Sequence, residues 1–189
     1  MTPYESACAA IDRATQDDPR ALEEPYSRRM VEETRRLAPR ASEELLLAAR
    51  AQHLRRWTIP RARYPEGRMG YLAWREMLKK FHAGTVAGIM KDAGYGEESI
   101  ATVGSLMVRK NTAADPEGQT LEDAACLVFL QFEFAEFAAK TAPDKVVDIL
   151  RKTWRKMSAQ ARERALAVDY GKDDRRLIEK ALAPPSPAG

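Results

Sequence analysis

Apolar residues recur along this chain at spacings of three and four, the period of an amphipathic α-helix, and not at the alternating spacing of a strand. Ala, Leu, Glu, Arg and Lys dominate the composition, and all five are strong helix formers. No stretch combines alternating apolar residues with the turn residues of a β-hairpin. The sequence therefore predicts an all-α fold.

Prolines, glycines and capping residues divide this pattern into separate helices. We predict a bundle of about eight or nine helices, formed by residues 3–16, 25–37, 41–57, 70–93, 97–109, 120–141 and 143–157, a helix capped by Ser158, and residues 173–182. Residues 58–67 and 111–118 are predicted loops. A single domain is predicted over residues 1–183, followed by a disordered tail at residues 184–189.

The length of 189 residues fits one domain, and the charge is nearly balanced. The 31 basic and 28 acidic residues leave a net charge of +3, which is too small to demand a nucleic-acid partner. No uncharged apolar run approaches the roughly 18 residues of a membrane span, and the first residues lack the profile of a secretory signal. Cys8 and Cys126 lie in no CxxC motif. We therefore expect a cytoplasmic protein without a membrane partner or a disulfide framework.

Three ionisable residues fall on predicted apolar helix faces, namely His53, His82 and Asp123. A single inward histidine is more often a core residue with its own partner, and an inward aspartate near a helix start is more often a capping residue. Imidazole and carboxylate groups from three helices are also the usual ligands of zinc, manganese or iron. We predict that these three residues bind one divalent metal, with separate core roles as the alternative.

The stretch between His53 and His82 is more basic than the rest of the chain, and it includes Arg55, Arg56 and Lys80. Arginine and lysine side chains bind phosphate groups well. We predict these three cations as substrate-binding residues for a phosphate-containing small molecule or for RNA. The alternative is a solvated basic surface without a ligand.

Motifs of several common enzyme classes are absent from the sequence. It contains no P-loop, no GxGxxG after a strand, no GxSxG and no HExxH. Cys126 lies among apolar residues, which favours a buried and unreactive thiol. The sequence therefore identifies no catalytic residue.

Five segments carry a resemblance to a known family. They are residues 47–60, 64–74, 78–82, 119–130 and 148–158, and they include the stretches LAARAQHLRRWTIP and YPEGRMGYLAW. These segments are similar to the family catalogued as domain of unknown function 4202, and the resemblance covers nearly the whole chain. It implies a family and no particular activity.

The order of the elements also resembles HD-domain metal-dependent phosphohydrolases. That family is all-helical and holds its metals with a His, a His-Asp pair, a later His and an Asp. Gln52-His53 stands where the family has the His-Asp pair, His82 looks like the later His, and Asp123 looks like the final Asp. The first His would fall near Tyr26. The resemblance therefore implies an HD-like bundle with either a single altered metal site or a metal-free site.

Two functions follow as hypotheses. The first is a metal-dependent phosphohydrolase of HD-like type that acts on a phosphoester, a nucleotide or a phosphorylated nucleic-acid end, with a metal-bound water as the nucleophile. The alternative is a non-catalytic nucleotide- or RNA-binding module on an HD-like scaffold that has lost its metal site. A third hypothesis, oxygen chemistry at iron, has too few visible ligands to be preferred.

Overall fold

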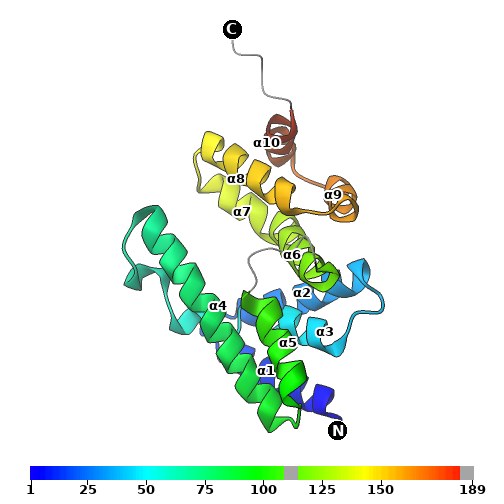
Figure 1. Ribbon diagram of the computed structural model, residues 1–189. Helices are drawn as coiled ribbons and strands as arrows, with labels where there is room; N and C mark the ends of the chain where they lie inside the picture. Colours follow the sequence, from blue (N-terminus) through cyan, green and yellow to red (C-terminus); the bar gives the residue numbers. More distant parts are fainter. Residues whose placement is uncertain (109–114, 184–189) are drawn as a thin grey trace. The chain divides into compact units, whose positions relative to one another are not determined.

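The computed structural model describes residues 1–108 and 115–183. Their regular structure is all-helical, with no strand in these ranges, as the sequence predicts (Figure 1). The α-helices are α1 (Pro3–Gln16), α2 (Glu23–Leu37), α3 (Glu43–Arg50), α4 (Gly67–Asp92), α5 (Glu97–Val108), α6 (Pro116–Val128), α7 (Phe134–Ala139), α8 (Pro143–Lys156), α9 (Ala159–Leu166) and α10 (Lys172–Leu182). Three short helical segments accompany them, the 3-10 helices η1 (Arg56–Thr58) and η2 (Arg61–Arg63) and the π-helical segment η3 (Phe129–Glu133).

The described residues thus contain ten α-helices, and the expected count of eight or nine is wrong. The additional helix arises because η3 divides the predicted helix over residues 120–141 into α6 and α7. This helical stretch also begins earlier than predicted, at Pro116, inside the predicted loop over residues 111–118. Residues 109–114 and the predicted disordered tail, 184–189, lie outside the described residues.

The chain divides into two compact units, Met1–Leu121 and Glu122–Gly189. The prediction of a single domain over residues 1–183 stays a prediction.

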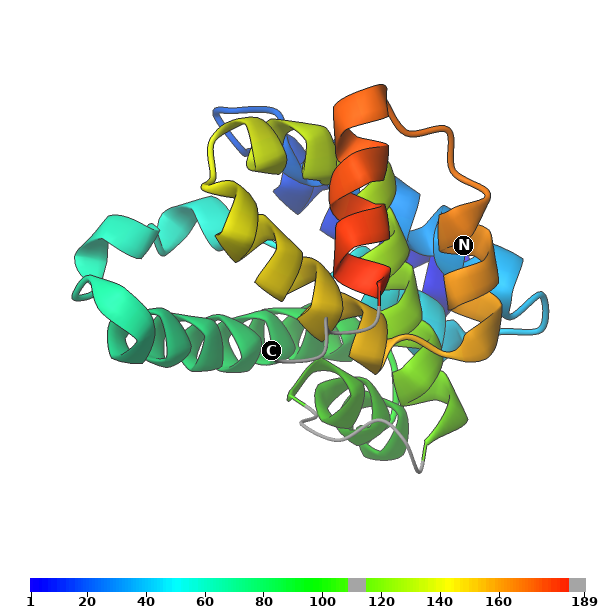
Figure 2. The same ribbon diagram turned by 90° about the horizontal axis from the view of Figure 1, so that it is seen from above.

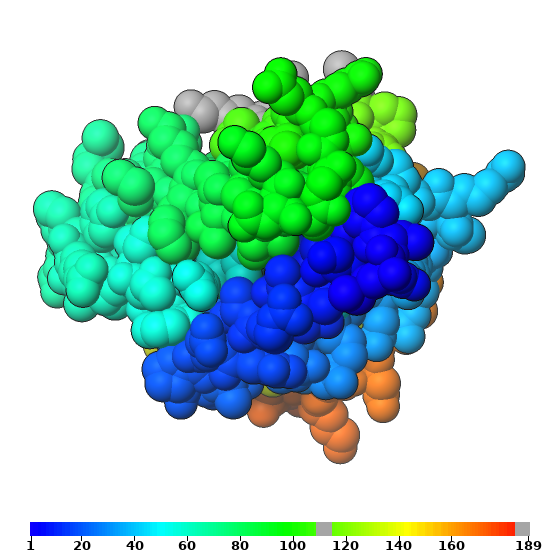
Figure 3. Space-filling model, turned by 90° about the horizontal axis from the view of Figure 1, so that it is seen from below, coloured from blue at the N-terminus to red at the C-terminus, as the bar shows by residue number. Residues whose placement is uncertain are grey.

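In the first unit, the long helix α4 packs against α5 and α1, and α3 packs against α2 and α5. Figure 3 shows α1, α4 and α5 at one surface of this unit. Its core is filled by fully buried aliphatic side chains, which include Ile11, Met30, Leu45, Leu47, Met90 and Val103. Such burial, and not helix propensity alone, is what holds short helices in place.

Polar caps fix where the helices of the first unit begin. Thr2 and Glu5 form a reciprocal capping box at the start of α1. Ser42 accepts a hydrogen bond from the Leu45 backbone N–H at 3.0 Å and so starts α3. The Asp18 carboxylate accepts the Leu22 N–H at 3.1 Å just before α2. These contacts satisfy N–H groups that have no partner inside their helix.

The helix predicted over residues 41–57 ends at Arg50, so the position of His53 on a helical stripe is wrong. Residues 51–55 form turns, and Arg55 has a left-handed backbone with φ of 54°. A side chain that is distant in sequence stabilises this backbone conformation. The buried Glu23 carboxylate accepts the backbone N–H groups of Arg55 and Trp57 at 2.8 and 3.1 Å. These bonds hold the chain in a conformation that an α-helix does not have.

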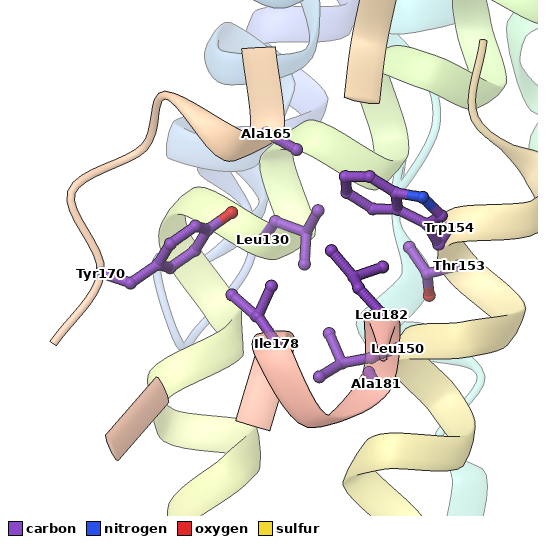
Figure 4. A pocket seen from close by; sticks show the side chains of 9 residues that line it. All are labelled: Leu130, Leu150, Thr153, Trp154, Ala165, Tyr170, Ile178, Ala181 and Leu182. Carbon is purple, nitrogen blue, oxygen red and sulfur yellow. The ribbon is translucent and has the colours of Figure 1, made fainter. Parts of the chain in front are cut away.

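The second unit contains α7 to α10 and most of α6, and α8 packs against α10 (Figure 2). Ser158 caps α9 by accepting the Ala161 N–H at 3.2 Å, which confirms the predicted cap. A small apolar pocket lies among α8, α10 and the chain after α9, with Trp154 and Tyr170 among its lining residues (Figure 4).

None of the described helices is long and apolar enough to cross a membrane.

Candidate functional site

His53 lies in the turns after α3, where its ring stacks on the ring of Tyr26 from α2. The ring centroids are 3.6 Å apart and the planes differ by 10°. Tyr26 is buried and His53 is partly buried. The stack fixes the plane of the imidazole, so only its ring edge is available for polar contacts.

Arg56 occupies one edge of that imidazole. Its Nη1 atom lies 2.7 Å from His53 Nε2. A guanidinium can only donate, so Nε2 must accept and the ring proton must sit on Nδ1. The guanidinium also lies over the ring of Trp74, 4.8 Å from the centroid. Trp74 is held in turn, because its Nε1 donates to the Ile59 carbonyl at 2.8 Å.

His82 is the second imidazole near this arginine. It lies on α4 with 5% of its surface exposed. Its Nε2 atom is buried and has no hydrogen-bond partner within the described residues. Burial first, and then the charge of Arg56, lowers the pKa of His82 to about 4.

The pKa of His53 is also lowered, and the charge of Arg56 again contributes after burial. Removal from water, and then the charges of Arg56 and His82, hold the pKa of His53 well below its ordinary value. Arg75 and Arg20 act in the same direction. Both imidazoles are therefore neutral at pH 7, and Arg56 lies within electrostatic range of each. We call His53, Arg56 and His82 the histidine–arginine cluster.

Glu23 supports the cluster by accepting backbone N–H groups of the segment that carries it, and the sequence prediction did not include this residue. Only 3% of its surface is exposed. Burial raises its pKa, although the N–H groups of Trp57 and Arg55 act against that rise. In sequence, Glu23 resembles an ordinary acidic residue of a first helical turn, so no local signal marks its contact with a turn 32 residues away.

The three predicted substrate-binding cations differ in position. Arg56 belongs to the cluster, whereas Arg55 pairs with Asp17, its Nη2 lying 3.6 Å from the carboxylate. Lys80 is exposed on α4, two residues from the buried His82 and so about 200° around the helix from it. Arg75 precedes His82 by seven residues and lies on the same face of α4. Arg75 is thus a better neighbour of the cluster than Lys80.

Asp123 belongs to the second unit, where it holds the beginning of α9. Its Oδ1 accepts the backbone N–H of Ser158 at 2.9 Å, and 3% of its surface is exposed. The adjacent Glu122 pairs with Lys156 at 2.9 Å. Asp123 lies inside α6, which begins at Pro116, so it does not cap the start of its own helix; its carboxylate instead serves the segment before α9. Its convergence with His53 and His82 stays a prediction.

The nitrogen atoms of the two imidazoles determine whether the cluster could hold a divalent metal ion. The neutral Nε2 of His82 is a suitable ligand atom. The Nε2 of His53 is not, because it accepts from the guanidinium of Arg56. A divalent ion bound there would also be repelled by that permanent cation. The cluster as arranged does not fit a metal, and an anion suits it better.

A family model for Domain of unknown function (DUF4202) matches residues 5–178. The chain belongs to this family. The match covers most of the chain and confirms the resemblance of the five sequence segments. No curated protein and no solved structure matches this DUF4202 chain. The cluster and Tyr26 all lie within the matched range of the DUF4202 model.

Proposed function

We propose that this DUF4202 protein is a non-catalytic binding module for a phosphate-containing small molecule such as a nucleotide, on an HD-like scaffold whose metal site has been lost. One observation carries the proposal. The guanidinium of Arg56 is held between His53 Nε2 and the Trp74 ring. After burial, its charge is the second cause that lowers the pKa of His82, a buried imidazole whose Nε2 has no partner within the described residues.

The electrostatics of the cluster favour an anion. Arg56 carries a permanent charge beside two imidazoles that burial and this charge keep neutral. The charges of Arg75 and Arg20 reach the same place, since both lower the pKa of His53. A phosphate bound to Arg56 would offset this positive potential and would accept hydrogen bonds from neutral imidazole N–H groups. Partial burial strengthens both effects, because less water screens them.

The stack of Tyr26 on His53 supports the HD-like part of the proposal. The resemblance to HD-domain proteins implies that their first metal-binding His corresponds to a position near Tyr26. It also implies that their His-Asp pair corresponds to Gln52-His53. In the first unit the rings of Tyr26 and His53 lie 3.6 Å apart. Two positions that the resemblance brings together are therefore neighbours in space, and one of them carries a phenol that ligates divalent metals poorly.

The metal-dependent phosphohydrolase remains the second candidate. The observation in its favour is the unpartnered Nε2 of the buried His82. A metal held with Asp123 would need Arg56 to leave His53, and the proposal of a binding module requires no such rearrangement.

Isothermal titration calorimetry with inorganic phosphate, AMP and ATP tests the binding module. We expect Arg56→Gln to weaken binding about tenfold or more. Lys145→Gln, which removes an exposed lysine of the second unit, should leave affinity unchanged. Equal affinity in wild type and Arg56→Gln would exclude the cluster as the site.

Metal analysis of the purified protein separates the two candidates. Stoichiometric zinc, manganese or iron that disappears in both His82→Gln and Asp123→Asn would favour the hydrolase and contradict the module. Metal content that is negligible, together with binding that depends on Arg56, would support the module.

A further inference from the structure

Tyr71 is an exposed aromatic residue on the same face of α4 as His82. It leaves 42% of its surface exposed. Arg75 follows one turn later, with its guanidinium carbon 5.9 Å from the centre of the Tyr71 ring and its Nη1 3.4 Å from the phenol oxygen. We call these two residues the tyrosine–arginine pair. The binding module as proposed uses only the charge of Arg75 and no contact of Tyr71.

Trp74 connects the tyrosine–arginine pair to the histidine–arginine cluster. The centre of its ring lies 6.0 Å from the centre of the Tyr71 ring, and the guanidinium carbon of Arg56 lies 4.8 Å from the Trp74 ring centre. These two distances limit the separation between the Arg56 guanidinium and the Tyr71 ring to about 11 Å. Trp74 is itself buried, with 7% of its surface exposed, so Tyr71 is the ring that a ligand bound to Arg56 can reach.

This separation suits a nucleotide. Six covalent bonds of about 1.5 Å each join the phosphorus of a nucleoside 5′-phosphate to the nitrogen of its base. With a contact distance added at each end, such a ligand reaches from a phosphate on Arg56 to a base on Tyr71. Nucleobases stack on tyrosine rings and on the guanidinium planes of arginine, and the tyrosine–arginine pair offers both surfaces. Inorganic phosphate or a simple sugar phosphate would leave the pair unused.

The surroundings of Tyr71 on α4 are basic and fixed in place. Arg68 and Arg75 lie three residues before and four residues after it, and both are exposed on its face, whereas Glu76 lies about 140° around the helix. The start of α4 is held by the Pro65 carbonyl, which approaches Gly70 so closely that a Cβ there would lie 1.9 Å from its oxygen. An anionic ligand is therefore attracted to a ring that needs little ordering before it can bind.

We propose that the ligand of the histidine–arginine cluster is a nucleotide, with its phosphate on Arg56 and its base stacked on the tyrosine–arginine pair. This inference rests on the proposed binding module, and it adds the base as a recognised group. Every nucleobase has an aromatic face, so the pair recognises nucleotides as a class and not one particular base. Tyr71 is then the residue that distinguishes nucleotides from other phosphate compounds.

Calorimetric titration with AMP, UMP and ribose 5-phosphate tests this inference. We expect the full-length protein to bind both nucleotides at least about fivefold more tightly than ribose 5-phosphate, which has no base. Tyr71→Leu keeps an apolar side chain but loses the ring. It should bind the nucleotides at least about fivefold more weakly and ribose 5-phosphate as wild type does. Tyr71→Phe keeps the ring and should retain the preference for nucleotides.

Two further variants complete the experiment. Phe132→Leu, at an exposed phenylalanine of the second unit, is the matched control and should bind all three compounds as wild type does. Arg56→Gln should weaken the binding of nucleotides and of ribose 5-phosphate alike. Circular dichroism verifies that each variant is folded.

The outcomes separate this inference from the proposed function. Equal binding of AMP and ribose 5-phosphate by wild type overturns the stacking of the base. Unchanged AMP affinity in Tyr71→Leu, or an equal loss for AMP and ribose 5-phosphate, does so as well. The binding module survives these results if Arg56→Gln still weakens the binding of ribose 5-phosphate. No binding of any of the three compounds, or binding that is unchanged in Arg56→Gln, overturns the binding module and this inference together.

Discussion

The Nη1 atom of Arg56 lies 2.7 Å from Nε2 of His53, so a permanent cation occupies the acceptor edge of a neutral imidazole. The two residues are three positions apart in turns that Glu23 stabilises through the N–H groups of Arg55 and Trp57. This contact decides the chemistry of the cluster. It removes one nitrogen from metal binding and places a positive charge where a phosphate would be attracted.

The charge of Arg56 should be visible in the titration of both imidazoles. The chain has two histidines, so every imidazole signal in an NMR spectrum belongs to His53 or His82. We expect His82 to titrate at about pH 4. Arg56→Gln should raise the pKa of both histidines, because it removes a neighbouring cation that opposes their protonation. Lys145→Gln should leave both titrations unchanged, and a wild-type His82 midpoint at the ordinary value of about 6.5 would contradict this account.

Stability should fall with acidity because His82 is buried in its neutral form. The pKa of His82 is about 4 in the folded protein and about 6.5 when the chain is unfolded, so the unfolded chain binds the proton more readily. Its contribution is therefore fully present above about pH 6.5 and is lost as the pH falls towards about 4. The loss is on the order of 3 kcal/mol.

Urea unfolding of wild type and His82→Gln at several pH values isolates this contribution. The difference in unfolding free energy between the two proteins should change across the window from about pH 6.5 to about pH 4 and stay constant above it. A difference that is the same at all pH values would show that His82 titrates normally in the folded protein.

Glu23 should contribute more to the free energy of unfolding than an exposed acidic residue of the same helix does. Glu23→Ala leaves the partly buried N–H groups of Arg55 and Trp57 without their carboxylate acceptor, and we expect it to lower the free energy of unfolding by about 1–3 kcal/mol. Glu23→Gln keeps one acceptor oxygen and should cost less. The NMR signals of His53 should shift in Glu23→Ala, since the turns that carry this residue are released. Glu24→Gln, in an exposed pair with Arg28, is the control, and an equal loss in that variant would refute a special role for Glu23.

Asp123 should act on stability through the start of α9. Asp123→Asn retains an oxygen that can accept the Ser158 N–H, whereas Asp123→Ala leaves that group unsatisfied. We therefore expect thermal unfolding to occur at a lower temperature in Asp123→Ala, by an amount equivalent to about 1–2 kcal/mol, with a smaller effect in Asp123→Asn. Identical melting of wild type and Asp123→Ala would show that this hydrogen bond contributes nothing.

Several elements could be predicted because their signals are local. Pro3 marks the first turn of α1, Pro143 opens α8, and Ser158 caps α9. The burial of His82 and Asp123 also followed from helical periodicity, which places them among apolar neighbours.

The end of α3 could not be predicted in this way. Residues 51–55 contain neither proline nor glycine, and the apolar spacing continues to Trp57. The helix stops at Arg50 because Glu23, distant in sequence, accepts backbone N–H groups of the following turn. The division of the predicted helix over residues 120–141 by η3 likewise has no proline or glycine to mark it.

By itself the sequence determined the helical class, most helix starts and the presence of polar groups on apolar faces. These properties depend on residue type and on spacing within a few turns, and the physics of helices is local. Only the tertiary structure decided what those polar groups touch. His53 meets Tyr26 and Arg56, while Asp123 meets the start of α9, because hydrogen-bond partners and charges are brought together by packing between segments that are far apart in the chain.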